Sequence, residues 1–578
     1  MERKEYNELQ NLFEKEGQST SWNIANVIRG NGYIDKATLV AAAYVLLLST
    51  DENADLSSVQ DFCASLNLDE DRESFLESYL SDSWQILAGI KGRYSSNVLR
   101  AIIIFYEDRD FRFGIDGRTP ESITKLANKL FGYSENDNVA DFGIGSAAFV
   151  TETHLTYPTL SFYGNDINAT TKELAAIKLE ILGCKIDLEC CNIFDMDSDA
   201  HKFDKIFANY PFGLRAREFT PEKNALLQKI LDKMTGISRS VSSDWLFNSA
   251  VMECLNDNGT AIAVMTNGST WNTIDRSARQ YFVENGFLQA VIALPERMFD
   301  NTNIPTTMVV LSRNNEKTML VDATNLCEKG RRINTFTDDS IDTIASAAFN
   351  EGEYSKVVSI KELQDNDYVI NPTRYLTPKT VIENGIPFAD CIKRITRGAP
   401  INASELDTMV SDKPTCYQYL MLKNIQKDQI DAELPYLTGI ADNLKKYCIK
   451  DRSLILSKNG APFKIAVAEV EEGKEILANG NLFVIEIDET IADPYFIKAF
   501  LESEKGIAIL KSITVGATIP NIGVESLKKI MVPNVPIEKQ REVVANYRAK
   551  IDEISLCKRK LEKLYNELNH FYDNEEWN

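Results

Sequence analysis

The alternation of short apolar runs with helical segments between residues 116 and 314 constrains the fold of this chain more than any other feature. Strands are predicted at 139–142, 160–165, 203–208, 260–265, 288–294 and 307–311, and helices at 172–182, 243–255 and 277–285. Strands that alternate with helices are typical of a doubly wound, mostly parallel sheet. We therefore predict an α/β domain over residues 116–365, with its functional groups at the C-terminal ends of the strands.

A helical region precedes this domain. The chain has 578 residues, which is too long for one hydrophobic core, so about three domains are expected. Residues 1–115 have helical patterns. The apolar run Leu39–Leu48 is too short to span a bilayer and predicts a buried helix, and Trp84–Ile90 and Val98–Phe105 indicate two further helices. We expect a helical N-terminal domain.

The chain changes character again after an extended connector at 366–376. Residues 377–535 are β-rich and irregular, and residues 536–578 are helical. The predicted fold is therefore α/β, with a C-terminal α+β domain that ends in a long helix.

The final helix carries apolar and long side chains at alternating four- and three-residue steps. These are Tyr547, Ile551, Ile554, Lys558, Leu561, Tyr565 and Leu568. Such spacing is typical of a heptad seam, which pairs helices in a coiled coil. The seam spans fewer than four heptads, so two interpretations stay open: pairing with a second copy, or packing on its own domain.

Composition narrows the class of protein. The N-terminus has no apolar signal segment and no run is long enough to cross a membrane, so no membrane association is expected. The ten cysteines are scattered, which suits a reducing cytoplasm, and three histidines argue against a histidine-based metal site or general base. The formal net charge is −22, but residues 376–578 hold 27 Lys and Arg against 30 Asp and Glu. Because DNA contact needs only a local basic face, this charge does not exclude a DNA partner.

The tetrapeptide Asn209-Tyr210-Pro211-Phe212 follows the predicted strand at 203–208 and has the groups that methylation of an exocyclic amine needs. Such an amine is a poor nucleophile because its lone pair is delocalised into the base. The Asn209 side-chain oxygen and the Tyr210 backbone carbonyl can accept its two N–H groups. Pro211 stiffens the turn, and Phe212 can stack on a base turned out of the duplex. We assign a catalytic role to these four residues.

Two further strand ends and one helix start predict a cofactor site. The first strand ends in Asp141-Phe142-Gly143-Ile144-Gly145-Ser146, a glycine turn that allows close approach of a cofactor. Asp166 ends the next strand and can bind both hydroxyls of a ribose. The third glycine of a dinucleotide-binding turn is missing, which favours S-adenosyl-L-methionine, a cofactor with a ribose and no phosphate. Thr119 is interpreted as the N-cap of a helix with Pro120 at its first position, where it could hold the methionine carboxylate or be a simple cap.

Taken together, these motifs resemble the gamma-type N6-adenine DNA methyltransferases, in particular the modification subunit of type I restriction–modification systems. The order Thr119-Pro120, Asp141–Phe149, Asp166 and Asn209–Phe212 is similar to that family. Further similar segments are Asp244-Trp245-Leu246-Phe247, the turn Asn256–Gly259 before a strand, Asn267-Gly268, Leu294–Phe299 and Asn303–Thr307. The resemblance covers about residues 1–375. It implies an S-adenosylmethionine-dependent, Rossmann-like domain that methylates adenine in double-stranded DNA, with Asp141, Gly143, Gly145, Ser146, Asp166, Thr119 and Asn192 around the cofactor and no metal.

The remaining residues resemble one half of a type I specificity subunit, through Ile519-Pro520-Asn521-Ile522, Leu527, Val532-Pro533, Pro536 and Glu538-Lys539-Gln540. That resemblance implies a target-recognition domain at 377–535, a dimerisation helix at 536–578 and two copies paired through Tyr547–Leu568. A separate restriction subunit is a possible partner.

Three motifs of the chain depart from the family pattern. Tyr210 replaces the usual proline, Ala147 and Ala148 replace glycines and are expected to crowd the cofactor, and Asn192 replaces an acid. These departures keep a second hypothesis open, in which the chain is a DNA-recognition component that has kept the fold but lost turnover and needs partner subunits.

Overall fold

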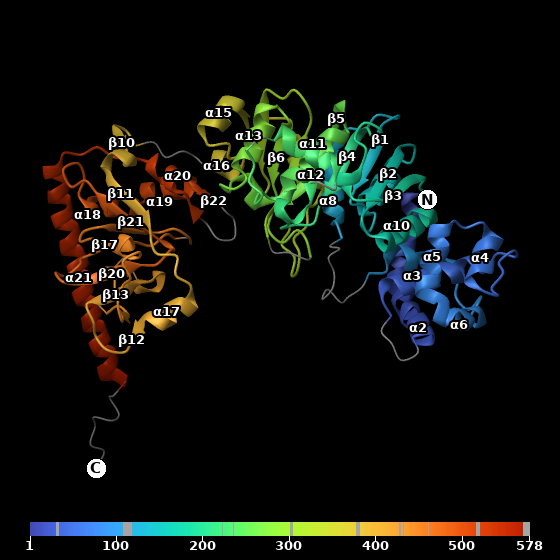
Figure 1. The fold of residues 1–578 in the computed structure, drawn as a ribbon, viewed down its shortest axis with the longest axis horizontal. Coiled ribbons are helices and arrows are strands. Elements are labelled where there is room, and N and C mark those ends of the chain that lie inside the picture. The colour runs from blue at the N-terminus through green and yellow to red at the C-terminus, as the bar shows by residue number, and fades with distance from the viewer. Residues whose placement is uncertain are drawn as a thin grey trace, which may run out of the picture. The chain divides into compact units, whose positions relative to one another are not determined.

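The computed structural model describes the whole chain except residues 30–33, 108–117, 222–223, 235, 301–303, 377–381, 427–428, 432, 461, 516–520 and 570–578. The expectations for Gly117, Asn303, Ile519, Pro520 and the domain limits at 116 and 377 lie outside the described residues. Within the chain, Met1–Leu376 and Thr377–Asn578 form two compact units. Figure 1 colours both along the sequence.

The first unit begins with a bundle of helices, several of which start at a side-chain cap. Asp35 accepts a hydrogen bond from the Thr38 N–H at the start of α3, and Ser95 does the same for Val98 at the start of α7. α3 is buried along most of its length, which confirms the buried helix predicted at Leu39–Leu48. The helices are α1 (Arg3–Leu12), which continues through a π-helical turn at Phe13–Gly17 into α2 (Gln18–Ile28), α3 (Lys36–Leu48), α4 (Val59–Leu66), α5 (Glu70–Leu80), α6 (Trp84–Gly89) and α7 (Ser96–Phe105).

A nine-stranded mixed sheet follows in the described residues, in the order β3-β2-β1-β4-β5-β7-β6-β8-β9. The strands β3, β2, β1, β4 and β5 are parallel to one another, and β7 is antiparallel to its neighbours β5 and β6. The predicted α/β fold is therefore confirmed. The strands are β1 (Asn138–Phe142), β2 (Ser161–Asp166), β3 (Ile186–Cys190), β4 (Phe203–Asn209), β5 (Leu255–Thr266), β6 (Leu288–Ala293), β7 (Thr306–Leu311), β8 (Lys317–Asp322) and β9 (Ser355–Ser359).

Helices cover both faces of this sheet and give it two cores. Alternate residues of each strand enter one core or the other, as the two-residue repeat of a strand requires. One core contains side chains from α8 (Glu121–Phe131), α9 (Ala148–Thr156), α10 (Ala169–Leu182) and α14 (Asp338–Ala347). The other contains side chains from α11 (Ala225–Lys233), α12 (Ser243–Cys254), α13 (Arg276–Glu284) and α15 (Ile360–Asp365).

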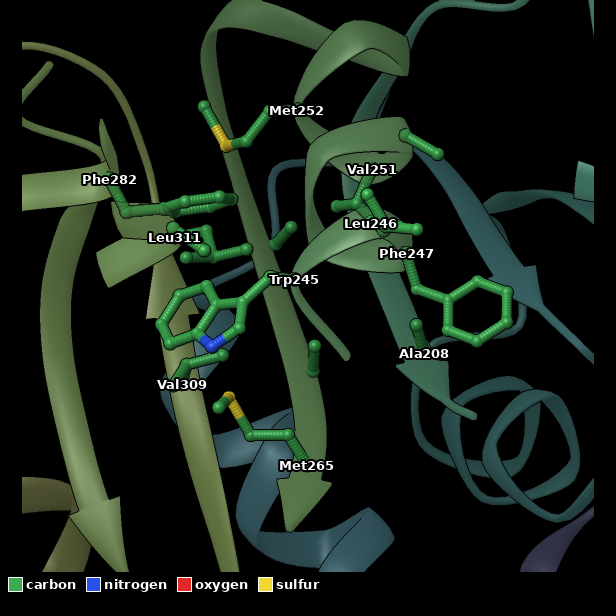
Figure 2. Close-up of a cluster of buried hydrophobic side chains, with 14 of the residues drawn as sticks. Ala208, Trp245, Leu246, Phe247, Val251, Met252, Met265, Phe282, Val309 and Leu311 are labelled. Carbon is green, nitrogen blue, oxygen red and sulfur yellow. The ribbon is translucent and has the colours of Figure 1, made fainter. Parts of the chain in front are cut away.

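Figure 2 shows the second core at α12. Trp245 points toward Val309 and Phe282, while Phe247 points to the other side of the helix. Trp245 is fully buried, and its ring lies 4.9 Å from that of Phe282. The Trp245 side of α12 therefore packs against β7 and α13 on this face of the sheet.

Two segments differ from the sequence-based prediction. The turn expected at 256–259 is a bulge inside β5, where Phe203 pairs with Leu255 and Lys205 pairs with Thr260. The backbone here still pairs with β4 on both sides, so the extra residues are absorbed without ending the strand. The extended connector expected at 366–376 instead folds onto the first unit. Ile370 donates its N–H to the Thr270 carbonyl, Tyr375 is buried, and the segment ends in the short helix α16 (Thr373–Leu376).

The second unit contains two main sheets, in agreement with the expected β-rich region. A four-stranded sheet has the order β11-β21-β18-β19, and a five-stranded sheet has the order β12-β16-β13-β20-β17. Their strands are β11 (Ile392–Arg397), β21 (Leu482–Ile487), β18 (Leu454–Ser457), β19 (Ile465–Val467), β12 (Val410–Ser411), β16 (Tyr436–Leu437), β13 (Tyr417–Leu420), β20 (Glu475–Ala478) and β17 (Cys448–Ile449). Shorter pairs join β10 (Gly385–Pro387) to β24 (Met531–Pro533), β14 (Ile425–Gln426) to β15 (Gln429–Ile430), and β22 (Thr514–Val515) to β23 (Asn521–Ile522).

The helices of this unit are α17 (Ala403–Met409), α18 (Pro494–Glu502), α19 (Glu504–Ser512), α20 (Val524–Lys528) and the long α21 (Ile537–Asn569). The start of α21 packs on its own unit, because Tyr547 accepts a hydrogen bond from Lys498 and donates one to Glu502. Further along the same helix Ile554, Leu561 and Leu568 are more than half exposed. Across the described residues, no helix is both long and apolar enough to span a membrane. All ten cysteines are described and carry free thiols.

Candidate functional site

The predicted site residues gather at one edge of the large sheet. β2, β1, β4 and β5 are parallel, so Asp166, Phe142, Asn209 and Thr266, which end them, lie along the same edge. Phe142 pairs with Ala208 in neighbouring strands, which places the glycine turn after β1 next to the tetrapeptide after β4. The tertiary structure thus brings together residues that are far apart in the sequence, such as Asp141 and Asn209, which are 68 positions apart.

Asn209 is held by a residue from outside the sheet. Its Nδ2 donates a hydrogen bond to Thr119 Oγ1 over 3.0 Å. Its Oδ1 is buried, and no other described residue donates a hydrogen bond to it. A buried acceptor without a donor costs about 1–3 kcal/mol, so such atoms are rare in folded proteins. The amide is therefore fixed in an orientation that leaves its oxygen available as an acceptor.

The helix cap predicted at Thr119 is wrong. α8 begins at Glu121, and Pro120 occupies its N-cap position with extended backbone angles and no side-chain cap. Thr119 lies one residue before that cap, so its hydroxyl is not used by the helix. It accepts from Asn209 instead, so the structure joins Thr119 to the tetrapeptide after β4.

Tyr210 is anchored by its ring. Its side chain is 5% exposed and stacks on Phe247 with ring centroids 4.5 Å apart and planes at 19°. Phe247 in turn stacks on Phe194 at 5.2 Å. Tyr210 Oη also donates to the Phe247 carbonyl over 3.3 Å, and burial raises the pKa of its phenol well above the ordinary value. The packed Tyr210 ring therefore holds this turn in place. This packing offsets the loss of the rigid proline ring that the family pattern has at this position.

Pro211 and Phe212 lie at the surface side of the turn. Pro211 is exposed, and Phe212 is partly buried with its ring 5.5 Å from that of Phe299 in an edge-to-face contact at 82°. This edge-to-face contact fixes the orientation of the Phe212 ring, which follows Asn209 closely in the chain.

The glycine turn after β1 is fastened to the end of β2. Gly143 and Gly145 have φ values of 74° and 51°, in the left-handed region that glycine adopts most readily. The Gly145 N–H donates to Asp166 Oδ2 over 3.1 Å, and the Asn168 N–H donates to Asp166 Oδ1 over 2.9 Å. Asp166 therefore orders the glycine turn and the start of α10 at the same time.

Asp141 is a buried carboxyl beside this turn. It is 3% exposed, and burial together with the neighbouring Asp166 raises its pKa well above the ordinary value. A carboxyl pair in which one member is desolvated is stabilised by a nearby positive charge. The chemistry of the pair thus suits a ligand that carries positive charge.

The turn has room for a ligand on its outer side. A side chain built at Gly143 would meet nothing within 4 Å, and one at Gly145 would meet only the Gly143 carbonyl at 3.9 Å. Ala147, which was expected to crowd a cofactor, is fully buried, and its methyl group is part of the hydrophobic core under the turn. Ala147 therefore does not fill the open side of the turn. S-adenosylmethionine fits this residue set, since the open turn, the carboxylate of Asp166 at the end of β2 and the acidic surroundings suit its shape and charge.

The remaining predicted residues have local roles. The Ser146 carbonyl accepts a hydrogen bond from Lys178 Nζ over 2.9 Å. The Asn192 side chain accepts from the Phe194 N–H over 3.0 Å and caps a short 3₁₀ turn after β3. Asn192 lies on the same sheet edge, but its amide oxygen is occupied by this cap.

Sequence reasoning gave no role to three residues that hold the site. Asn165 accepts from the Gly143 N–H through its backbone carbonyl at 3.1 Å and donates from Nδ2 to the Cys191 carbonyl at 3.1 Å. Lys178 is buried behind the glycine turn, and burial lowers its pKa to about 7. Asp244, on α12, accepts from Thr266 and Ser269 at 2.6 Å each and braces the end of β5. Asn165 and Asp244 lay inside motifs that the sequence marked, whereas Lys178 carried no signal.

Comparison with known proteins agrees with the family resemblance of the first unit. Residues 117–384 match the N-6 DNA Methylase family. Over 307 residues the chain is 25% identical to the type I restriction enzyme HindI methylase subunit of Haemophilus influenzae, which is 48% of this chain and 67% of that relative. Over 299 residues it is 25% identical to the MjaIX methylase subunit of Methanocaldococcus jannaschii, which is 47% of this chain and 53% of that relative. The chain thus spans about half to two thirds of the length of these curated relatives.

Two solved structures resemble the chain, and the first of them shares its fold. A nuclease-deletion mutant of the Type ISP restriction-modification enzyme LlaGI, in complex with a DNA substrate mimic, covers 94% of this chain and 67% of its own with a TM-score of 0.52 and 12% identity. A type I methyltransferase subunit from Streptococcus thermophilus covers 63% of this chain and 98% of its own with a TM-score of 0.49 and 17% identity. Residues 117–384 thus match the N-6 DNA Methylase family, and the chain is similar in sequence to methylase subunits of type I restriction enzymes.

Proposed function

We propose that this chain is a site-specific DNA methyltransferase that transfers a methyl group from S-adenosyl-L-methionine to N6 of an adenine. The observation that carries the proposal is the Asn209 side-chain oxygen, which is buried without a donor while the other end of the same amide is held by Thr119. The family match of residues 117–384 and the curated relatives support the same reaction.

The chain's own groups prepare the adenine nitrogen. Asn209 Oδ1 and the Tyr210 carbonyl accept the two N–H groups of N6, which favours a pyramidal nitrogen with an available lone pair. The proton that N6 later loses passes to solvent, so no dedicated base is required. Catalysis then rests mainly on positioning, which the Thr119 hydrogen bond and the Tyr210–Phe247 stack provide.

The cofactor would be held at the glycine turn. S-adenosylmethionine, when bound, supplies the electrophilic methyl group. Asp166 would bind the ribose hydroxyls, Asp141 would face the positive charge, and the backbone of Gly143–Ser146 would line the open side of the turn. Asn192 would lie near the adenine ring of the cofactor.

The substrate adenine would be turned out of double-stranded DNA. A base inside a duplex cannot reach a group at a sheet edge, so enzymes of this kind act on extruded bases. Phe212, fixed by its contact with Phe299, would stack on the extruded adenine.

The second unit would recognise the DNA sequence, as the resemblance to half a specificity subunit implies. Two copies of the chain would pair through the exposed part of α21, where Ile554, Leu561 and Leu568 lie on the surface. A separate restriction subunit is a further partner in this proposal, and a cytoplasmic setting accords with the free thiols.

The alternative function is a recognition component without turnover. It rested on three departures from the family pattern, and the anchored Tyr210 and the buried Ala147 methyl both weaken it. Titration with S-adenosylmethionine separates the two, since the alternative expects no binding.

The decisive experiment measures transfer of labelled methyl from S-adenosylmethionine to unmethylated genomic DNA. We expect transfer by the wild type, a loss of about 100-fold or more in Asn209→Ala, and wild-type transfer in Asn350→Ala, which removes an exposed amide from the same unit. If the wild type binds DNA and cofactor but transfers nothing, the proposal is rejected in favour of the recognition component.

A further inference from the structure

One edge of the four-stranded sheet in the second unit presents two cations that have no acidic partner among the described residues. β11 and β18 both run antiparallel to β21 and flank it, so they end at the same edge. Arg397 is the last residue of β11 and pairs with Phe483, while Lys458 follows Ser457, which pairs with Leu482. The two residues are about two interstrand spacings apart, roughly 10 Å. We call this pair the Arg397–Lys458 edge.

The chain's own groups leave these charges largely unused. Arg397 Nε donates to the Gly480 carbonyl over 2.6 Å, which leaves the other guanidinium N–H groups without a described acceptor. Lys458 Nζ donates to no described residue, and neither cation forms an ion pair within the described chain. By contrast, Lys393 and Arg394 of β11, and Arg452 just before β18, each lie within 4 Å of a carboxylate.

The two charges also repel each other. Partial burial lowers the pKa of the Lys458 ammonium, and the Arg397 guanidinium lowers it further. Holding like charges together without a counter-charge is unfavourable, so this arrangement favours an anion from outside. It is notable in a chain whose formal net charge is −22, because most surface of such a protein repels polyanions.

A close backbone contact and several hydrogen bonds hold the backbone around the edge in place. A side chain at Gly398 would come within 2.2 Å of the Asn479 carbonyl, so only glycine allows the strand after Arg397 to lie against the turn at 478–480. On the other side, the Lys458 N–H donates to the Asn481 carbonyl, and the Ile522 N–H donates to the Lys458 carbonyl. The buried Asn459 side-chain oxygen next to Lys458 has no described donor. Both cations are thus presented by a braced backbone.

We propose that the Arg397–Lys458 edge binds phosphate groups of double-stranded DNA and is the electrostatic contact of the second unit with the substrate. This inference rests on the proposed function for its ligand, and it assigns that contact to named residues. Two fixed cations at one edge of the sheet suit the closely spaced phosphates of a duplex, which attract Lys and Arg at any sequence.

The test measures binding of the full-length protein to a fluorescein-labelled mixed-sequence duplex by anisotropy, without cofactor, at about 50, 100 and 200 mM salt. Each phosphate contact contributes about 0.9 to the slope of log affinity against log salt. Arg397→Ala/Lys458→Ala should therefore reduce that slope by about 2 and weaken binding on the order of 50-fold at about 0.1 M salt.

Two matched variants control for charge and for folding. Lys445→Ala/Lys474→Ala removes the same charge from exposed cations that already pair with Asp442 and Glu471, and it should change binding by less than about 2-fold. Arg397→Lys/Lys458→Arg keeps both charges and should retain the wild-type slope. The proposal is overturned if the alanine pair and its charge-matched control weaken binding equally, or if an RNA hairpin loses affinity and the duplex does not.

The outcome can be separated from that of the methylation experiment. A reduced slope in a protein that never transfers methyl supports the edge and rejects the enzyme. Normal transfer and normal DNA affinity in Arg397→Ala/Lys458→Ala reject the edge and leave the enzyme intact.

Discussion

Replacing Thr119 by valine removes one hydrogen bond and leaves the volume of the side chain almost unchanged. In the wild type, Thr119 Oγ1 accepts from Asn209 Nδ2 over 3.0 Å, and Asn209 Oδ1 is left free of described donors. Without that acceptor the amide loses its preferred orientation. A neutral hydrogen bond contributes about 0.5–1.5 kcal/mol net, which corresponds to a fall of about 2-fold to about 13-fold in the methylation rate.

The assay is single-turnover methyl transfer at saturating S-adenosylmethionine, with cofactor affinity measured separately by titration. Thr119→Val should lower the rate within the stated range and leave cofactor affinity unchanged, because the hydroxyl orients Asn209. Thr119→Ser retains the oxygen and should stay close to the wild type. Asn209→Ala should fall much further, by about 100-fold to 1,000-fold, because it removes the acceptor itself.

Two results would refute this reasoning. A wild-type rate in Thr119→Val would mean that the hydrogen bond does not orient the amide. A weakened cofactor affinity with an unchanged rate at saturation would mean that Thr119 holds the cofactor carboxylate, as its position in the sequence first indicated.

Three further predictions concern the surroundings of the site. Tyr210→Phe should keep activity, whereas Tyr210→Ala should destabilise the first unit by about 3–5 kcal/mol and reduce transfer although the backbone carbonyl remains; equal thermal melting of the two variants would contradict the anchoring role of the ring. Asp166→Asn should weaken S-adenosylmethionine by tenfold or more in calorimetric titration, and an unchanged affinity would remove Asp166 from the cofactor site. Asp141→Asn tests the raised pKa of Asp141. A carboxyl with a raised folded-state pKa contributes full stability below its unfolded value of about 3.8 and loses that contribution as pH rises through the folded-state value. The asparagine variant should therefore melt above the wild type at pH 8, by a margin that shrinks toward pH 5, and a constant margin would show that Asp141 does not titrate in this way.

Much of the first unit could be predicted from local patterns. The strands at β1, β2, β4, β6 and β7 were each placed to within a residue or two, because buried strands read as short apolar runs. β3 was missed: Ile186, Leu188 and Cys190 alternate with polar residues in a half-exposed strand at the end of the sheet. β8 and β9 were also missed, since their pairing with β6 and with each other joins segments distant in sequence.

Only part of the candidate site could likewise be predicted from the sequence. Asn209, Asp141 and Asp166 could be selected because acids and amides at the ends of apolar runs are visible in the sequence. The orientation of the Asn209 amide could not be foreseen, because it depends on Thr119, 90 positions earlier. The cap assigned to Thr119 failed for a related reason: a helix start is a local pattern, but the hydroxyl is taken by a distant partner.

The sequence by itself determined most of the order of strands and helices in the first unit, the types of residue at the strand ends and the family that residues 117–384 match. Hydrophobic periodicity and turn-forming residues depend on residues close in the sequence, so a single sequence is enough to recognise them. Only the tertiary structure decided that the Tyr210 ring anchors the turn after β4, that the Ala147 methyl lies in the core, and that Arg397 and Lys458 share one edge. Each of these depends on which distant segments pack together, and that is fixed by the burial and pairing of the whole fold.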